Sequence, residues 1–151
     1  MKTGKEIKSR FLSTSPLFNY IPDKDRYLSY KEQPKYRFNI IGTGIMGQEH
    51  IRITMAEARA TVHGVYDPNP QSVEAAKQNF AMLAPGQELV VYESLEKACN
   101  DPEVDALIIC TPNFSHIDVV KVAAKSGKHI MLEKPMATTI ADAAEIVELS
   151  K

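Results

Sequence analysis

The chain has 151 residues, of which 44% are hydrophobic and 25% charged, and its formal net charge is −1. This balance is that of one ordinary globular domain, and no run approaches the roughly 18 apolar residues of a membrane span. Cys99 and Cys110 lack the spacing of a disulfide framework or a zinc site, and the first residues lack a secretory signal, so we expect a cytoplasmic protein with no metal and no membrane contact.

Charge is distributed unevenly along the chain. Residues 1–37 carry nine Lys and Arg against four Asp and Glu, whereas residues 38–151 carry nine against fifteen. The acidic body argues against nucleic acid as a partner. Because acidic residues interrupt the basic segment, we interpret residues 1–35 as a partly ordered N-terminal arm rather than a polyanion-binding tail. Its aromatic side chains need a surface, either on the following domain or on another subunit.

From Tyr36 onward, short β-branched runs alternate with longer amphipathic runs, which predicts alternating strands and helices. The predicted strands cover residues 36–41, 61–66, 89–92, 104–110 and 129–133. The helices that follow them are predicted at 45–58, 71–83, near Ser94, at 116–125 and at 139–151. Turn chemistry at Asp67-Pro68 and a glycine at position 127 mark two of these boundaries.

Five strand–helix units with short connections require a parallel sheet that right-handed crossovers cover on both faces. The fold class is therefore α/β, a doubly wound (Rossmann) sheet with strand order 3-2-1-4-5. The apolar face of the last helix is expected to lie against the fifth strand. A complete sheet of this type has a sixth strand, which would begin after residue 151, so we expect the chain to be truncated before that strand and before a second domain.

A glycine pattern separates the first strand from its helix: Gly42-Thr43-Gly44-Ile45-Met46-Gly47, or GxGxxG. The first glycine permits a tight turn, the second leaves the backbone open to a diphosphate, and the third lets helix and strand pack closely. Free N–H groups and the dipole at the helix start would bind the diphosphate. Glycine-rich turns also serve packing alone, but this strand-to-helix position favours a cofactor-binding site and makes residues 36–151 a dinucleotide-binding domain.

Asp67 lies twenty residues beyond Gly47, at the end of the second predicted strand. A carboxylate there can accept hydrogen bonds from both hydroxyls of the adenosine ribose, and it would repel a 2′-phosphate. Residues 68–72 contain no Arg or Lys to neutralise such a phosphate, so NAD is preferred to NADP as the cofactor. The alternative is that Asp67 is only a turn residue before Pro68.

Two further groups of polar residues follow the fourth and fifth predicted strands, whose ends face the ligand crevice in this fold. The first contains Thr111, Pro112, Asn113, Ser115 and His116, and the second contains Glu133, Lys134 and Pro135. The first would bring backbone and amide groups near the nicotinamide, and a lysine in the second can donate to a substrate oxygen and help move a proton. From the residues alone, plainer interpretations are helix capping by Asn113 or Ser115, a water-facing His116 and an exposed Glu133–Lys134 ion pair.

In their order and spacing, the segments GTGIMGQEH, VYD, ICTPNFSH and GKHIMLEKP resemble the nucleotide-binding half of the glucose-fructose oxidoreductase, inositol dehydrogenase and MocA family. The resemblance covers about residues 36–151. It implies an NAD(P)-dependent oxidoreductase that transfers a hydride between nicotinamide and a hydroxyl or ketone of a sugar, cyclitol or related small molecule. It also implies that Lys134 is catalytic, touching the reacting oxygen, and that Thr111, Pro112, Asn113, His116 and Glu133 contribute to cofactor binding.

Family members usually run to more than twice this length, with a second domain that supplies a catalytic histidine. Neither His50 nor His129 is assumed to replace that histidine. We therefore expect the chain to bind NAD and, alone, to turn over substrate poorly or not at all. The alternative is a non-catalytic nucleotide-binding or regulatory module, which would have no need of Lys134; the EKP and TPNFSH segments disfavour a methyl-donor enzyme. The open sheet edge and the apolar arm predict a homo-oligomer.

Overall fold

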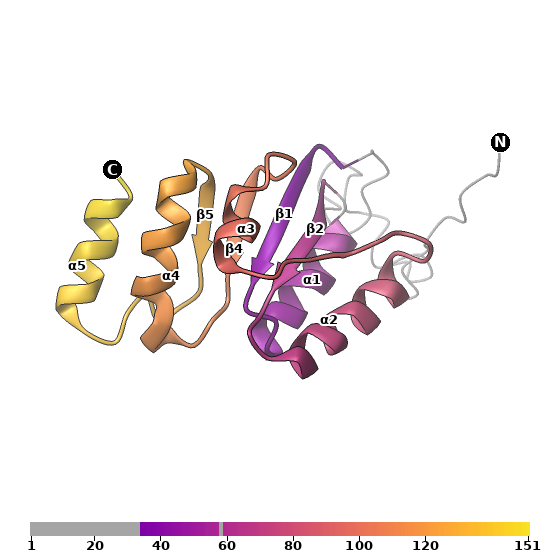
Figure 1. The fold of residues 1–151 in the computed structure, drawn as a ribbon, viewed down its shortest axis with the longest axis horizontal. Coiled ribbons are helices and arrows are strands. Elements are labelled where there is room, and N and C mark those ends of the chain that lie inside the picture. Colours follow the sequence, from indigo (N-terminus) through magenta and orange to yellow (C-terminus); the bar gives the residue numbers. More distant parts are fainter. Residues whose placement is uncertain (1–33, 58) are drawn as a thin grey trace, which may run out of the picture.

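A five-stranded parallel sheet lies at the centre of the computed structural model, which describes residues 34–57 and 59–151 (Figure 1). The strands are β1 (Tyr36–Ile41), β2 (Ala60–Tyr66), β3 (Val90–Val91), β4 (Ala106–Ile109) and β5 (His129–Leu132). Their order is β3-β2-β1-β4-β5, which confirms the predicted fold class and topology. The predicted arm, residues 1–35, lies almost wholly outside the described residues.

The register of the strands brings their carboxyl ends to one edge of the sheet. Ile41, the last residue of β1, pairs with Tyr66 at the end of β2 and with Ile109 at the end of β4. Ile109 in turn pairs with Leu132 at the end of β5. The segments that follow these strands, which contain most of the predicted site residues, therefore leave the sheet side by side.

Five α-helices cover the two faces of the sheet and divide the core in two. They are α1 (Ile45–Glu57), α2 (Pro70–Leu83), α3 (Leu95–Asn100), α4 (His116–Ala123) and α5 (Ile140–Leu149), with single 3₁₀ turns η4 (Asn113–Ser115) and η5 (Ala124–Ser126) beside α4. Successive residues of a strand face opposite sides, so Ile40 packs with α1 and α2 while Ile41 packs with α3 and α4.

The capping residues explain where several helices begin and end. Asn69 accepts a hydrogen bond from Gln71 N at the start of α2, with Pro70 as the first helical residue. Thr139 caps α5 by accepting from Asp142 N, and Gly127 ends the α4–η5 segment in the left-handed conformation, with φ of 67°. The helix end predicted at Gly127 is confirmed, and the predicted starts of α2 and α5 are each within one residue of the observed ones.

The last helix differs from the prediction. Ile140 is 91% exposed, and α5 lies beside α4 at the outer end of the molecule, where the buried side chain is Ile146 and an ion pair joins Lys121 to Glu145 (Figure 1). Its main partner is α4 rather than β5, because the inward residues of β5 already pack in the core that α4 covers. The outward residues of β5, His129 and Met131, are exposed, so only one face of this strand is covered.

A polar cluster joins Tyr92, directly after β3, to His63 in β2 and to Asp101, directly after α3. The Tyr92 hydroxyl donates to Asp101 Oδ2 at 2.6 Å, and His63 Nε2 lies 3.5 Å from the same oxygen. The hydrogen bond from Tyr92 is the main reason that the pKa of Asp101 is lowered, and burial raises the pKa of Tyr92.

Tyr92→Phe is expected to reduce the free energy of unfolding at pH 7 by about 1–2 kcal/mol, because a hydrogen bond to a carboxylate is lost. Since Asp101 has a lowered pKa in the folded state, its contribution is present above the ordinary carboxyl pKa of about 3.9 and is lost as the pH falls through the folded value. Urea denaturation at pH 7 and pH 3 should therefore show a smaller difference between wild type and variant at pH 3. An equal difference at both pH values would contradict this account.

Candidate cofactor site

The turn that leaves β1 needs glycine at its first position for two reasons. Gly42 has a φ of 90°, a conformation that residues with a side chain rarely adopt. A Cβ at this residue would also lie 2.7 Å from Thr111 N and 2.9 Å from Cys110 O. The end of β4 therefore packs directly on the backbone of the turn.

The other two glycines of the pattern, Gly44 and Gly47, differ in the space that a side chain would have. A Cβ on Gly47 would lie 2.1 Å from Gly42 O, so α1 can approach the turn only if that residue lacks a side chain. A Cβ on Gly44 would have no heavy atom within 4 Å. Gly44 and the two residues after it are exposed, and Ile45 and Met46 belong to the first turn of α1, whose N–H groups have no acceptor within the helix. The turn thus presents an open backbone at Gly44 and free donors beside it.

Asp67 follows β2 directly and contacts the glycine turn. Its Oδ2 accepts hydrogen bonds from Thr43 N at 2.6 Å and Thr43 Oγ1 at 3.2 Å, and its Oδ1 accepts from Asn69 N at 2.8 Å. The bond to Asn69 is the predicted turn role, and the bonds to Thr43 also place the carboxylate at the glycine turn. An ionised carboxylate has about four acceptor positions, so capacity remains for a ligand hydroxyl.

A pocket of about 310 Å³ opens beside this carboxylate. It is lined by Asp67, Pro68, Pro70, Val73, Glu74, Lys77 and Val91. Sequence reasoning did not identify Val73, Lys77 or Val91, although the helical period of α2 places residues 70, 73, 74 and 77 on one face. Lys77 lies beyond residues 68–72, and its Nζ makes an exposed ion pair with Glu74 Oε2 at 3.2 Å.

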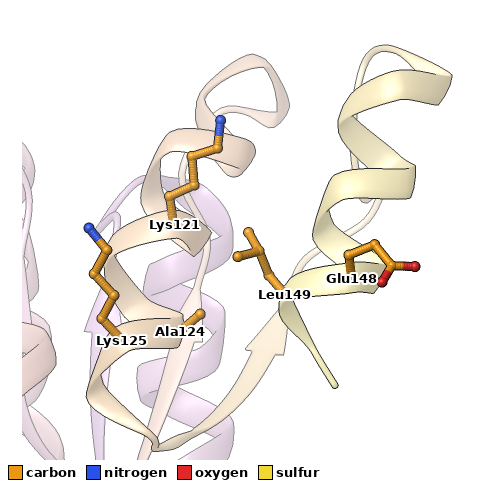
Figure 2. Close-up of a pocket in the computed structure, with 5 residues that line it drawn as sticks. All are labelled: Lys121, Ala124, Lys125, Glu148 and Leu149. Carbon is orange, nitrogen blue, oxygen red and sulfur yellow. The ribbon is translucent and has the colours of Figure 1, made fainter.

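A larger pocket, of about 550 Å³, lies elsewhere, between α4 and α5 (Figure 2). Its lining contains Lys121, Ala124, Lys125, Glu148 and Leu149, and Figure 2 shows the lysines on α4 and its continuation with the last two residues on the facing helix. None of these residues belongs to the predicted site, and no segment at the carboxyl edge of the sheet contributes to the pocket. We therefore place the candidate site at the glycine turn and not in the larger pocket.

The segment after β4 is held by His116, whose ring is 1% exposed. Its Nε2 lies 2.9 Å from Thr111 O and its Nδ1 lies 3.1 Å from Met136 O. The interpretation of His116 as a water-facing residue is wrong, because the ring fills the space between the segments after β4 and β5. A direct contact between His116 and a cofactor stays a prediction.

Asn113 and Ser115, in the same segment, do not cap the helix that follows them. Helix capping by Asn113 or Ser115 is wrong, because neither side chain accepts a hydrogen bond from the start of α4, and the Ser115 hydroxyl instead donates to Pro112 O at 2.7 Å. The Thr111 hydroxyl is buried without a partner among the described residues. A buried polar group of this kind calls for an explanation, and a ligand at this edge of the sheet would supply one.

Glu133, directly after β5, makes an ion pair that was not predicted. Its Oε1 is 2.7 Å from His50 Nε2, and its Oε2 accepts from the backbone N–H of Lys134 at 3.0 Å. The hydrogen bond with His50 is the main reason that the pKa of Glu133 is lowered. An exposed Glu133–Lys134 side-chain pair is therefore not the principal interaction of this carboxylate. Lys134 itself is exposed, and its bond to Pro135 is cis.

The described residues contain no group of three or more His, Cys, Asp or Glu side chains able to hold a metal ion. Within the same residues, no helix has the length and apolar character needed to cross a membrane.

A parallel sheet of order 3-2-1-4-5, with an open glycine turn at its central strand and a carboxylate at the end of the next strand, defines a dinucleotide-binding α/β protein. Residues 36–151 match the model of the glucose-fructose oxidoreductase, inositol dehydrogenase and MocA family, which is described as an oxidoreductase family with an NAD-binding Rossmann fold. The chain belongs to this family.

Relatives and solved structures agree with this assignment. The chain is 34% identical to an inositol 2-dehydrogenase of Paracoccus denitrificans and 38% identical to one of Acidiphilium cryptum, each over 74% of this chain and 32% of that protein. The structure of a myo-inositol dehydrogenase from Lactobacillus casei in complex with NAD(H) and myo-inositol matches with a TM-score of 0.69 at 31% identity, covering 76% of this chain and 32% of that one. The chain thus spans about a third of the length of these relatives.

Proposed function

We propose that this chain binds NAD(H) at the glycine turn and forms the nucleotide-binding part of a dehydrogenase that acts on a hydroxyl group. One observation carries this proposal: of the three glycines in the pattern, Gly42 and Gly47 are closed in by backbone atoms, whereas Gly44 faces open space. Packing alone explains the first two. An open, exposed glycine beside free helix N–H groups is what the close approach of a diphosphate requires.

On this proposal, the residues of the turn, Gly42 to Gly47, bind the diphosphate with the N–H groups of the first turn of α1. Asp67 accepts hydrogen bonds from the adenosine ribose, and the pocket beside it receives the adenine. The carboxylate disfavours a 2′-phosphate, which supports NAD over NADP. The residues present therefore fit the cofactor.

The segments after β4 and β5 would form the nicotinamide end of the site. Thr111, Pro112 and Asn113 would supply backbone and side-chain groups, with His116 and Glu133 supporting them. Bound NAD supplies the hydride acceptor. Lys134 would donate a hydrogen bond to the reacting oxygen and hold or move its proton, a role suited to an exposed lysine at a strand end.

The substrate class that we propose is a sugar, cyclitol or related polyol, supported by the inositol 2-dehydrogenases to which the chain is similar. Residues 36–151 would act as the dinucleotide-binding domain, preceded by the arm at residues 1–35. We also propose a cytoplasmic location, which the two free cysteines support, and self-association of the protein.

Asp67→Asn is expected to reduce the preference for NADH over NADPH at least about tenfold, because the substitution removes the charge that repels a 2′-phosphate and keeps an oxygen to accept from Thr43. Fluorescence titrations with both nucleotides measure the ratio of dissociation constants. Asp118→Asn, the same change at an exposed position on α4, is the matched control and should leave the ratio unaltered. An unaltered ratio in Asp67→Asn would remove Asp67 from the proposed site.

A further inference from the structure

His50 and Glu133 form a link between two segments that are distant in sequence. His50 lies on α1, three residues after Gly47, and Glu133 follows β5. Their side chains are 21% and 14% exposed, and His50 Nε2 is 2.7 Å from Glu133 Oε1. At this distance and burial the contact is a charge-assisted hydrogen bond, which is stronger and more directional than an exposed ion pair.

The Glu133 carboxylate also binds the backbone of the next residue, Lys134. Glu133 Oε2 accepts from Lys134 N at 3.0 Å, while Glu133 N donates to Ile109 O at 3.0 Å. Each carboxylate oxygen thus has its own partner, one on α1 and one in the backbone of Lys134. If the side chain of Glu133 were released, the backbone N–H of Lys134 would lose its acceptor.

The surrounding groups favour the ionised form of the Glu133 carboxyl group. The pKa of Glu133 is lowered by the hydrogen bond to His50 and, to a smaller degree, by the Lys134 N–H and the charges of His50 and Lys134. A carboxylate only accepts, so His50 Nε2 carries the shared hydrogen in either charge state of the ring. Burial and the charge of Glu133 raise the pKa of the neighbouring Cys110 thiol to about 12, so this thiol adds no charge beside the carboxylate.

We propose that His50 is a positioning residue, which acts through Glu133 to tie the segment carrying Lys134 to the helix that begins at the glycine turn. The proposal rests on the proposed function, in which Lys134 meets the reacting oxygen. One helix would then hold the diphosphate at its first turn and the lysine segment at its second. This arrangement fixes Lys134 relative to the bound cofactor, and such fixing is what the orientation of a proton-handling group requires.

The test compares two replacements of His50 by NMR on the isotope-labelled chain. His50→Leu removes the donor, and His50→Gln keeps an N–H donor without a charge. In His50→Leu we expect amide exchange at Lys134 to accelerate at least about tenfold and the carboxyl titration of Glu133 to move to higher pH. In His50→Gln the Lys134 amide should remain protected, while the Glu133 titration stays above that of wild type. His129→Gln, on the exposed face of β5, is the control and should change neither signal.

An unchanged Lys134 amide and an unchanged Glu133 titration in folded His50→Leu would overturn the proposal. If His50→Leu does not fold, an unchanged Glu133 titration in His50→Gln overturns it as well. NADH titration of the wild-type chain separates this result from the proposed function. If the Lys134 amide and the Glu133 titration respond as expected but the chain does not bind NADH, the His50–Glu133 link is supported and the proposed function is overturned. Signals that do not respond in a chain that binds NADH overturn the link alone.

Discussion

Gly44→Ala is expected to weaken NADH binding by more than about a hundredfold, on the order of 3 kcal/mol, and to leave the fold intact. A methyl group at this position meets no protein atom within 4 Å, so the folded chain accommodates it. It projects instead into the space where a diphosphate would approach the backbone. Displacing the diphosphate would break at least two hydrogen bonds to charged oxygens, each worth about 1.5–3 kcal/mol.

Calorimetric titration with NADH and urea denaturation together measure the two halves of this prediction. The free energy of unfolding should stay within about 1 kcal/mol of wild type, because replacing glycine by alanine at an unstrained position has effects of that size. A Gly44→Ala chain that binds NADH as tightly as wild type would show that the open face of the turn is not where the cofactor lies.

Gly47→Ala is expected to reduce the free energy of unfolding by about 3 kcal/mol or more, a large part of the roughly 5–15 kcal/mol available to a domain. The new Cβ would lie 2.1 Å from Gly42 O, and the atom that it meets belongs to the backbone, which cannot rotate away as a side chain can. Either α1 moves away from β1, which opens the core around Ile40 and Ile51, or the turn rearranges.

Thermal and urea denaturation of Gly47→Ala measure this loss, and Gly44→Ala serves as the matched control, since the same substitution is made three residues away. The two variants should separate stability from binding, because Gly47→Ala lowers the free energy of unfolding whereas Gly44→Ala weakens NADH binding. A Gly47→Ala chain as stable as wild type would mean that helix and turn do not pack as closely as the structure has them.

The topology and most element boundaries could be predicted because they depend on local patterns. Short β-branched runs such as residues 36–41, the GxGxxG turn and capping residues such as Thr139 act over a few neighbours in the chain. The parallel order then follows from the short connections and the handedness of crossovers. The same reasoning placed Gly42, Asp67, Thr111 and Glu133 at one edge of the sheet, where the structure has them.

The features that were missed depend on long-range contacts that no local pattern encodes. The His50–Glu133 pair joins residues 83 positions apart, and the ring of His116 reaches Met136 across a segment that the sequence does not place. The apolar sequence of β5 indicates a strand but not which of its faces is covered. His50 had one usable signal, since it lies one helical turn beyond Gly47 and therefore on a helix whose start was already assigned to the site.

The measurement that tests the central claim most directly is a calorimetric titration of the unmodified chain with NADH and, separately, with NADPH. The geometry of the glycine turn and Asp67 predicts saturable binding of one NADH per chain and distinctly weaker binding of NADPH. Absence of saturable binding by either nucleotide, or a preference for NADPH, would contradict the account.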